Sequence, residues 1–171
     1  MNLETRAGQR ITNGSSPKWS PDGETVAYLH DNGVWLYDVR RGNTRQILHR
    51  EDHRYQDLGD SIAWSPDSKR VVLVANIGES SELVILPISG EEKPQVRCAL
   101  SSSVDGNLAW NSDQEIVFCL RETNRDQSRM VAVSPDDDSP PKQMSQFDDQ
   151  NGWKSACLTP DRKWYIAVSQ N

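Results

Sequence analysis

Hydrophobic and polar positions alternate in short stretches along the chain, and clusters of turn-forming residues separate these stretches. In the first unit, ETVAYLH, VWLYDV and TRQILH have a period of two and contain β-branched and aromatic residues, which is typical of strands. SPDG at Ser20–Gly23 has the proline and glycine positions of a type I turn. Asp31–Gly33 contains the Asn-Gly pair that favours a type I′ hairpin. With the extended run SPKWS in front, the unit predicts four antiparallel strands.

This unit recurs along the chain. KWSPDGETVAYL at 18–29 returns as AWSPDSKRVVLV at 63–74, AWNSDQEIVFCL at 109–120 and CLTPDRKWYIAV at 157–168. The aspartates that mark the unit are 45, 46 and 48 residues apart; they are Asp22, Asp67, Asp113 and Asp161. Four short antiparallel strands at this period form one blade of a β-propeller. SPDD at Ser134–Asp137 repeats the letters, but it falls between the third and fourth strands of its unit and begins no repeat.

We therefore predict an all-β fold, a β-propeller of four-stranded antiparallel blades. It forms a single domain over residues 1–171, with about four repeats that start near 15, 60, 106 and 154. Residues 1–14 match the end of the first unit and are expected to supply an outer strand to the last or a neighbouring blade. The C-terminus has only first and second strands, so the two ends would form one composite blade that closes the ring. A partial ring that other chains complete is the alternative.

Three tryptophans, Trp19, Trp64 and Trp110, end the first strand of their units. A bulky residue repeated at one position is expected to pack between blades, rather than to form a stacking platform for bases or sugars. We therefore expect all three to be largely buried. The motif aspartates are expected to hold their turns by accepting hydrogen bonds from backbone N–H groups.

Composition and charge exclude several classes of function. Hydrophobic residues make up 35% of the chain and charged residues 26%, so a thin core is expected. The net charge of −6 argues against binding to nucleic acid, which needs a cationic surface. No apolar run reaches the roughly 20 residues that cross a bilayer, so no membrane insertion is expected. The N-terminus has no apolar signal core. A cytoplasmic location follows if Met1 is the native start, and a periplasmic one if a signal sequence was removed.

No pattern of catalytic or metal-binding residues is found. His49, Asp52, His53 and Asp57 lie close in sequence, but their segment lacks the helical period that would bring them together on a metal, so a solvated functional loop is favoured. No G-x-S-x-G elbow for a nucleophilic serine occurs. We expect no enzyme activity, no metal and no cofactor. The cysteines lack C-x-x-C spacing and are expected to be buried free thiols; they are Cys98, Cys119 and Cys157.

At WSPDG…VAY…NG…WLYDV…GNTRQIL the chain resembles the repeat of TolB-type β-propellers, relatives of the WD-repeat proteins. The first unit matches that pattern in full, and the second departs from it only at Ser68, which replaces glycine. The third unit keeps Trp110 and the aspartate, while in the fourth Leu158 stands in for tryptophan. The resemblance implies a rigid ring whose loops bind proteins or peptides, and it does not imply catalysis.

We expect the two faces of the ring to differ. Turns between the first and second strands are uniform, whereas the loops of the opposite face vary in length and composition: HREDHRYQDLGD, NIGESS, SSSVDG, RETNRDQS and FDDQNGW. The variable face is therefore the expected binding site for a protein or peptide. The candidate partner-binding residues are His53, Arg54, Tyr55, Phe147 and Trp153. The alternatives are a regulatory propeller of a larger hydrolase, a ligand-binding central pocket, and a structural subunit that self-associates or assembles with other subunits through blade edges.

Overall fold

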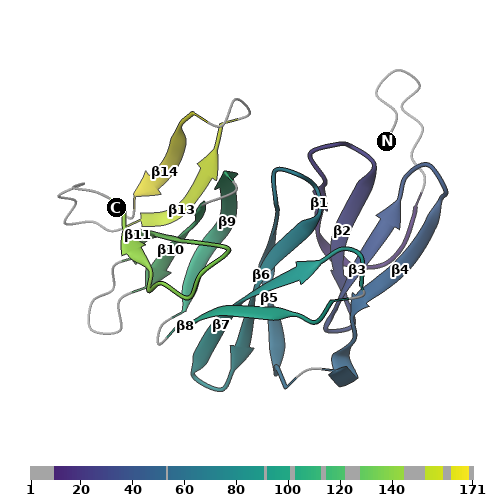
Figure 1. Ribbon diagram of the computed structural model, residues 1–171, viewed down its shortest axis with the longest axis horizontal. Coiled ribbons are helices and arrows are strands. Elements are labelled where there is room, and N and C mark those ends of the chain that lie inside the picture. Colours follow the sequence, from purple (N-terminus) through teal and green to yellow (C-terminus); the bar gives the residue numbers. More distant parts are fainter. Residues whose placement is uncertain are drawn as a thin grey trace.

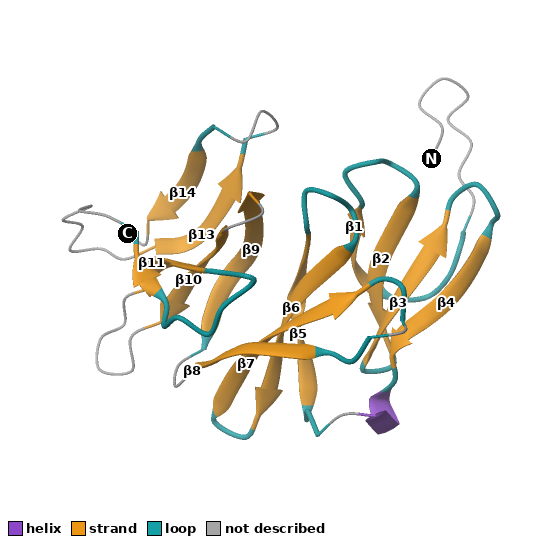
Figure 2. Cartoon of the chain, viewed as in Figure 1, coloured by secondary structure: helices purple, strands orange, loops and turns teal. Residues whose placement is uncertain are grey.

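The computed structural model describes residues 10–52, 54–90, 92–100, 103–112, 115–121, 128–144, 153–159 and 163–169. Of 52, 105, 112, 153–158 and 166–169 only the backbone is described. The regular structure in these ranges is β-strand, apart from one short 3-10 turn, η1, at Arg50–Asp52 (Figure 2). The all-β prediction is therefore confirmed.

The strands form antiparallel sheets whose order in space follows their order in the sequence. The first sheet contains β1 (Ser15–Trp19), β2 (Thr25–His30), β3 (Gly33–Asp38) and β4 (Asn43–Leu48). The second contains β5 (Asp57–Trp64), β6 (Arg70–Ile77), β7 (Ser80–Pro87) and β8 (Gln95–Leu100). The third contains β9 (Val104–Ser112), β10 (Glu115–Arg121), β11 (Ser128–Val133) and β12 (Lys142–Gln143). The last pairs β13 (Trp153–Leu158) with β14 (Tyr165–Ser169).

The four sheets pack side by side through their first strands, because β1 contacts β5, β5 contacts β9 and β9 contacts β13. The β1–β4 sheet and the β13–β14 sheet lie at opposite ends of this row (Figure 1). The described part of the chain thus forms a row of propeller blades, and it does not show a closed ring. Residues 10–14, the described part of the outer strand expected over 1–14, form no strand.

Each pair of neighbouring sheets encloses its own hydrophobic core. The core between the first two sheets contains Ala27, Leu29, Val34, Leu36 and Leu48 from one side and Ile62, Trp64, Val71, Leu73, Ala75, Val84 and Leu86 from the other. The next core joins Ala63, Val72, Val74, Leu83 and Ile85 to Leu108, Trp110, Ile116, Phe118, Val131 and Val133. Since side chains alternate along a strand, β6 and β7 supply one face to each core. The second sheet is therefore buried on both faces.

Backbone bonds of the motif turns recur in the first hairpins of the first, second and last sheets. The Gly23 amide donates to the Ser20 carbonyl (N···O 2.9 Å), and the Ser68 amide donates to the Ser65 carbonyl (3.0 Å). In the last sheet, the Thr159 amide donates to the Trp164 carbonyl (2.9 Å). The equivalent bond in the first sheet joins the Ser20 amide to the Thr25 carbonyl (2.8 Å). These bonds place equivalent residues of successive repeats at equivalent positions.

Two connections differ from the sequence predictions. In the first hairpin, His30 pairs with Gly33, so Asp31 and Asn32 are the central residues, with φ of 48° and 51°. The predicted Asn-Gly turn is therefore wrong by one residue. The stretch at 76–81, predicted as a loop, continues the ladder to the pair Ile77–Ser80. Only Gly78 and Glu79 form the turn, because Gly78 adopts a positive φ of 59°.

Candidate functional site

The β4–β5 connection crosses from the outer strand of the first sheet to the first strand of the second. Its η1 turn is followed by Arg54, Tyr55 and Gln56. The Gln56 amide donates to the Asn76 carbonyl (2.9 Å), and the Asn32 side chain donates to the Gln56 carbonyl (3.2 Å). The connection is therefore fixed at once to the β6–β7 and the β2–β3 hairpins.

A buried carboxylate lies under this connection. Glu82, near the start of β7, has a side chain that is only 10% exposed, and the Arg54 guanidinium binds its Oε1 at 2.5 Å. Arg54 itself is 69% exposed. The second oxygen of Glu82, Oε2, is buried and has no hydrogen-bond partner among the described residues. A buried charge that is only half satisfied is costly, so this oxygen favours any further donor that reaches it.

Tyr55 is half-buried and packs against the core between the first two sheets. Burial raises the pKa of Tyr55 to about 12, and the nearby Glu82 carboxylate adds to this rise. The side chain is thus a neutral aromatic surface beside the carboxylate. Tyr55 is therefore only partly exposed, because its ring extends the hydrophobic core at the edge of the sheet.

Polar side chains on the other face of the β6–β7 hairpin form a separate network. The Ser81 hydroxyl donates to the Asn76 side-chain carbonyl (2.7 Å), and the Asn76 amide donates to the Asp57 carboxylate at the start of β5. Because successive side chains along a strand point to opposite faces, Ser81 and Glu82 lie on different faces of the sheet. We call Arg54, Tyr55 and Glu82 the Glu82 cluster.

The other candidate partner-binding residues do not add to this cluster. His53 and Phe147 lie outside the described residues. Trp153 begins β13, and only its backbone is described. Sequence reasoning missed Glu82. The available signal was a single acidic residue at the start of the apolar strand ELVILPI, where a charge needs a partner.

The repeated tryptophans are not equivalent in their burial. Trp64 and Trp110 are 6% and 3% exposed at the two sheet junctions, and the Trp64 indole donates to the Lys18 carbonyl of the first sheet (2.9 Å). Trp19 is 63% exposed. The expectation that Trp19 is buried is therefore wrong, because no described sheet packs against the face that carries it.

The motif aspartates bind backbone and hydroxyl groups of their own turns. Asp22 accepts from the Ser20 hydroxyl (2.6 Å) and the Glu24 amide (2.9 Å), and these bonds lower its pKa. Asp67 accepts from the Ser65 hydroxyl (2.6 Å) and the Lys69 amide (3.0 Å). Burial raises the pKa of Asp67, but these bonds together with the nearby positive charges of Arg70 and Lys69 outweigh it and lower the pKa. Asp113 and Asp161 lie outside the described residues.

A cavity of about 630 Å³ lies at the opposite, motif-turn end of the second sheet. Its charged lining residues are Arg45, Asp67, Lys69, Arg70, Glu92, Arg97 and Asp136. Arg70 is paired with Asp136 (2.8 Å), so the positive charge of this lining is largely balanced. Among the described residues, no group of three or more histidine, cysteine or acidic side chains gathers in metal-binding geometry.

Two further expectations from the sequence concern the cysteines and membrane insertion. Cys98 and Cys119 are free thiols, and burial raises the pKa of Cys98 to about 11. Only the backbone of Cys157 is described. Within the described ranges, no helix has the length and apolar character to cross a membrane.

Solved structures with the same fold are numerous, although neither a protein-family model nor a curated protein sequence matches this chain. TolB from Acinetobacter baumannii is 16% identical, with a TM-score of 0.73 over 97% of this chain and 41% of the TolB chain. Pyrococcus horikoshii acylaminoacyl peptidase is 16% identical, with a TM-score of 0.64 over 98% of this chain and 30% of that chain. Porphyromonas gingivalis dipeptidyl peptidase 4 is 13% identical, with a TM-score of 0.63 over 90% and 29%. This chain spans less than half the length of each. It has the blade fold of the TolB-type β-propellers.

Proposed function

We propose that this chain is a non-catalytic binding module, which holds a protein or peptide partner on the face formed by the β4–β5 connection and the β6–β7 hairpin. The observation that carries the proposal is the half-satisfied carboxylate of Glu82, buried beneath an exposed arginine. Such a carboxylate attracts a basic side chain, and the net charge of −6 favours the approach of a basic partner.

The cluster combines the residue types that anchor interfaces. Tyr55 offers an aromatic surface fixed by the core, and Arg54 offers a guanidinium that is mostly in solvent. Tyrosine and arginine are enriched among the residues that carry most of the binding energy at interfaces. A lysine or arginine of the partner would approach the Glu82 carboxylate from the side on which Arg54 is exposed, while its aliphatic stem packs on the Tyr55 ring.

A panel of short peptides that differ only in charge tests the proposal. Binding is measured by isothermal titration with the full chain and its E82Q variant, which keeps the size of the side chain and removes the charge. We expect basic peptides to bind and E82Q to weaken their binding at least tenfold. E79Q is the matched control, because Glu79 is an exposed acid of the adjacent hairpin turn and its loss should change affinity little. Equal losses in both variants would show an unspecific charge effect and contradict the proposal.

A second candidate function is the regulatory propeller of a larger hydrolase. It is favoured by the dipeptidyl peptidase and the acylaminoacyl peptidase named above, of which this chain covers 29% and 30%. The size of the native protein in its own cells tests this candidate. A native product several times longer than 171 residues, with peptidase activity on chromogenic peptides, would support it. A native product of this length without such activity would contradict it.

A further inference from the structure

The first sheet presents one face without a neighbouring sheet in the described part of the chain. Paired residues on adjacent strands share a face, and the register joins Trp19 to Val26, Val26 to Tyr37 and Tyr37 to Thr44. We call the face that carries these four residues the open face. The opposite face of the same sheet carries Ala27 and Leu36, which are buried against the second sheet.

The same face is covered in the next two sheets. Trp64 and Trp110 hold the position of Trp19, and each is buried by the sheet that precedes it in the chain. Trp19 has the same position in the repeat but is 63% exposed. At both of these junctions, therefore, such a face packs against another sheet that is built from the same kind of repeat unit.

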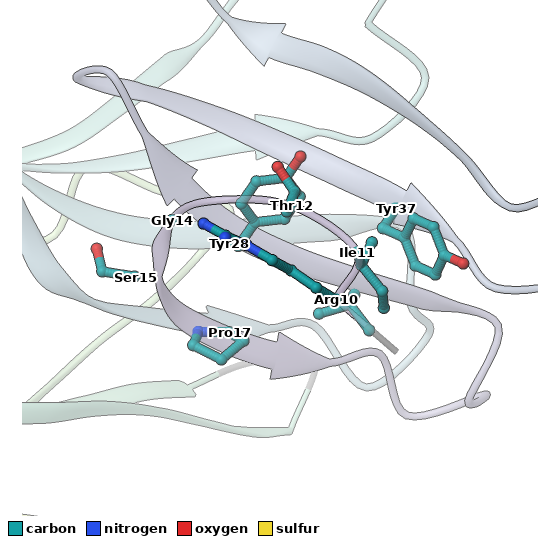
Figure 3. A pocket seen from close by; sticks show the side chains of 9 residues that line it. Arg10, Ile11, Thr12, Gly14, Ser15, Pro17, Tyr28 and Tyr37 are labelled. Atoms are coloured by element: carbon teal, nitrogen blue, oxygen red, sulfur yellow. The ribbon is translucent and has the colours of Figure 1, made fainter. Parts of the chain in front are cut away.

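The open face also has a hollow in which a side chain can be accommodated. A cavity of about 250 Å³ lies between the sheet and the segment that precedes β1. Figure 3 shows the Tyr28 and Tyr37 rings of the sheet facing this segment, with Ile11 beside Tyr37. Ile11 is 51% exposed, so this border, like the open face with Trp19, leaves a large apolar side chain in solvent.

The other end of the row carries a matching exposed tryptophan. Trp164 is 70% exposed and directly precedes β14. Its neighbour Tyr165 packs against the third sheet. Because successive side chains point to opposite faces, Trp164 belongs to the face of the last sheet that is turned away from the third.

Backbone hydrogen bonds identify the residue of an earlier repeat that is equivalent to Trp164, and the contact of that residue is known. The Trp164 amide donates to the Thr159 hydroxyl (3.2 Å), and the Arg70 amide donates to the Ser65 hydroxyl (2.8 Å), so the two residues are equivalent. Arg70 lies over the ring of Trp110, the tryptophan of the next sheet, with its Cζ 4.9 Å from the ring centroid. At the junction of the second and third sheets, this position therefore stacks on the tryptophan of the following sheet.

We propose that two copies of this chain associate head to tail, with Trp164 of one copy stacked on Trp19 of the other. The junction repeats the contact between Arg70 and Trp110, and it covers the open face with the last sheet of the second copy. The interface is heterologous, because each copy contributes a different surface. Both exposed tryptophans, one at each end of the row, are thereby removed from water, and the aromatic pair adds to the burial of apolar area.

Light scattering after size-exclusion chromatography of the full chain tests the proposal. We expect a mass above that of the monomer that rises with concentration, and we expect W19E and W164E each to weaken self-association at least tenfold. Both side chains are exposed, so both variants should fold. T44R places a charge on the open face at a second position and should act in the same way. V96E is the control, since Val96 is exposed on the outer strand of the second sheet, away from both ends.

Mixing the two variants distinguishes a head-to-tail contact from a symmetric one. The W19E copy keeps Trp164 and the W164E copy keeps Trp19, so an equimolar mixture regains one intact junction and should form dimers. A protein that stays monomeric at all concentrations would overturn the proposal. This includes a monomer whose ring closes within one chain and so shields the fluorescence of Trp19 from quenchers. A mixture that stays monomeric, or an oligomer that W19E leaves intact, would overturn it as well. None of these outcomes depends on peptide binding at the Glu82 cluster.

Discussion

The backbone amide of Asp22 donates a hydrogen bond to the hydroxyl of Ser68, 3.1 Å away, and so joins the motif turn of the first sheet to that of the second. Ser68 takes the place that Gly23 has in the first turn, and its φ is 60°. A left-handed conformation costs a residue with a side chain about 1–2 kcal/mol. The bond between the turns offsets part of this cost.

Replacing Ser68 separates the hydrogen bond from the backbone strain. S68A loses the bond and keeps the strain, so we expect it to lower the free energy of unfolding by about 1 kcal/mol. S68G loses the bond but relieves the strain, and it should be less destabilising than S68A. Urea denaturation of the two variants and the wild type measures both effects. An S68G variant that is less stable than S68A would contradict this explanation of the turn.

Trp64 is expected to be the most sensitive of the aromatic residues at the junctions. It is buried between the first two sheets and donates to the Lys18 carbonyl. W64A should cost about 3–5 kcal/mol, because it leaves a cavity at the junction. W64F keeps most of the packing and should cost less, chiefly through the lost bond. Thermal or urea denaturation measures both variants. W35F is a comparison variant, because the Trp35 indole has no hydrogen-bond partner among the described residues and its N–H can be removed without loss of a bond.

The repeat predicted the blades because its signals are local. Strand periodicity and the motif turn are both contained within about a dozen residues, and the structure places strands and turns there. The exact hairpin was not predictable in this way. Asn32-Gly33 suits a type I′ turn by propensity, but the register of the whole β2–β3 ladder puts Gly33 opposite His30 and leaves Asp31 and Asn32 in the turn.

Features that depend on neighbouring sheets were the least predictable. The repeat assigns Trp19 and Trp64 the same role, yet their burial differs because only Trp64 has a sheet in front of it. Glu82 was missed for a related reason. Its significance depends on Arg54 and Tyr55, which the β4–β5 connection brings to it from 28 and 27 residues earlier in the chain.

Gly33 and Gly23 are expected to resist substitution for different reasons. A Cβ at Gly33 would lie 2.7 Å from the Leu48 carbonyl oxygen, which is backbone and cannot easily move. A Cβ at Gly23 would meet nothing within 4 Å, but its φ is 74°. G33A should therefore cost about 1–3 kcal/mol through overpacking, and should also weaken the β3–β4 pairing. G23A carries only the conformational cost of about 1–2 kcal/mol. Denaturation gives both values, and amide exchange in β4 should rise in G33A alone.

The raised pKa of Tyr55 predicts a change of stability at alkaline pH. The pKa is about 12 in the folded chain and about 10 in an unfolded one, so the folded state binds the phenolic proton more tightly. Its contribution is therefore fully present below pH 10 and is lost as the pH rises toward 12. Urea midpoints of wild type and Y55F should keep a constant difference up to about pH 10, and the wild type should then lose stability relative to Y55F. A constant difference from pH 9 to 12 would show that Tyr55 titrates normally.

The ion pair between Arg54 and Glu82 should appear as a coupling in a double-mutant cycle. In the wild type, R54A removes the partner of a buried carboxylate and leaves that charge unpaired. In an E82Q background no buried charge remains, so the same substitution should cost much less. The expected coupling between the two positions is about 0.5–3 kcal/mol, in the range of residues that share one buried interaction. Urea denaturation of the four proteins measures this coupling. It should decrease only modestly at high salt, because the carboxylate is shielded from solvent. Additivity of the two substitutions within about 0.3 kcal/mol would mean that Arg54 is held above Glu82 without stabilising it, and the carboxylate would then be available to a partner at no cost to the fold.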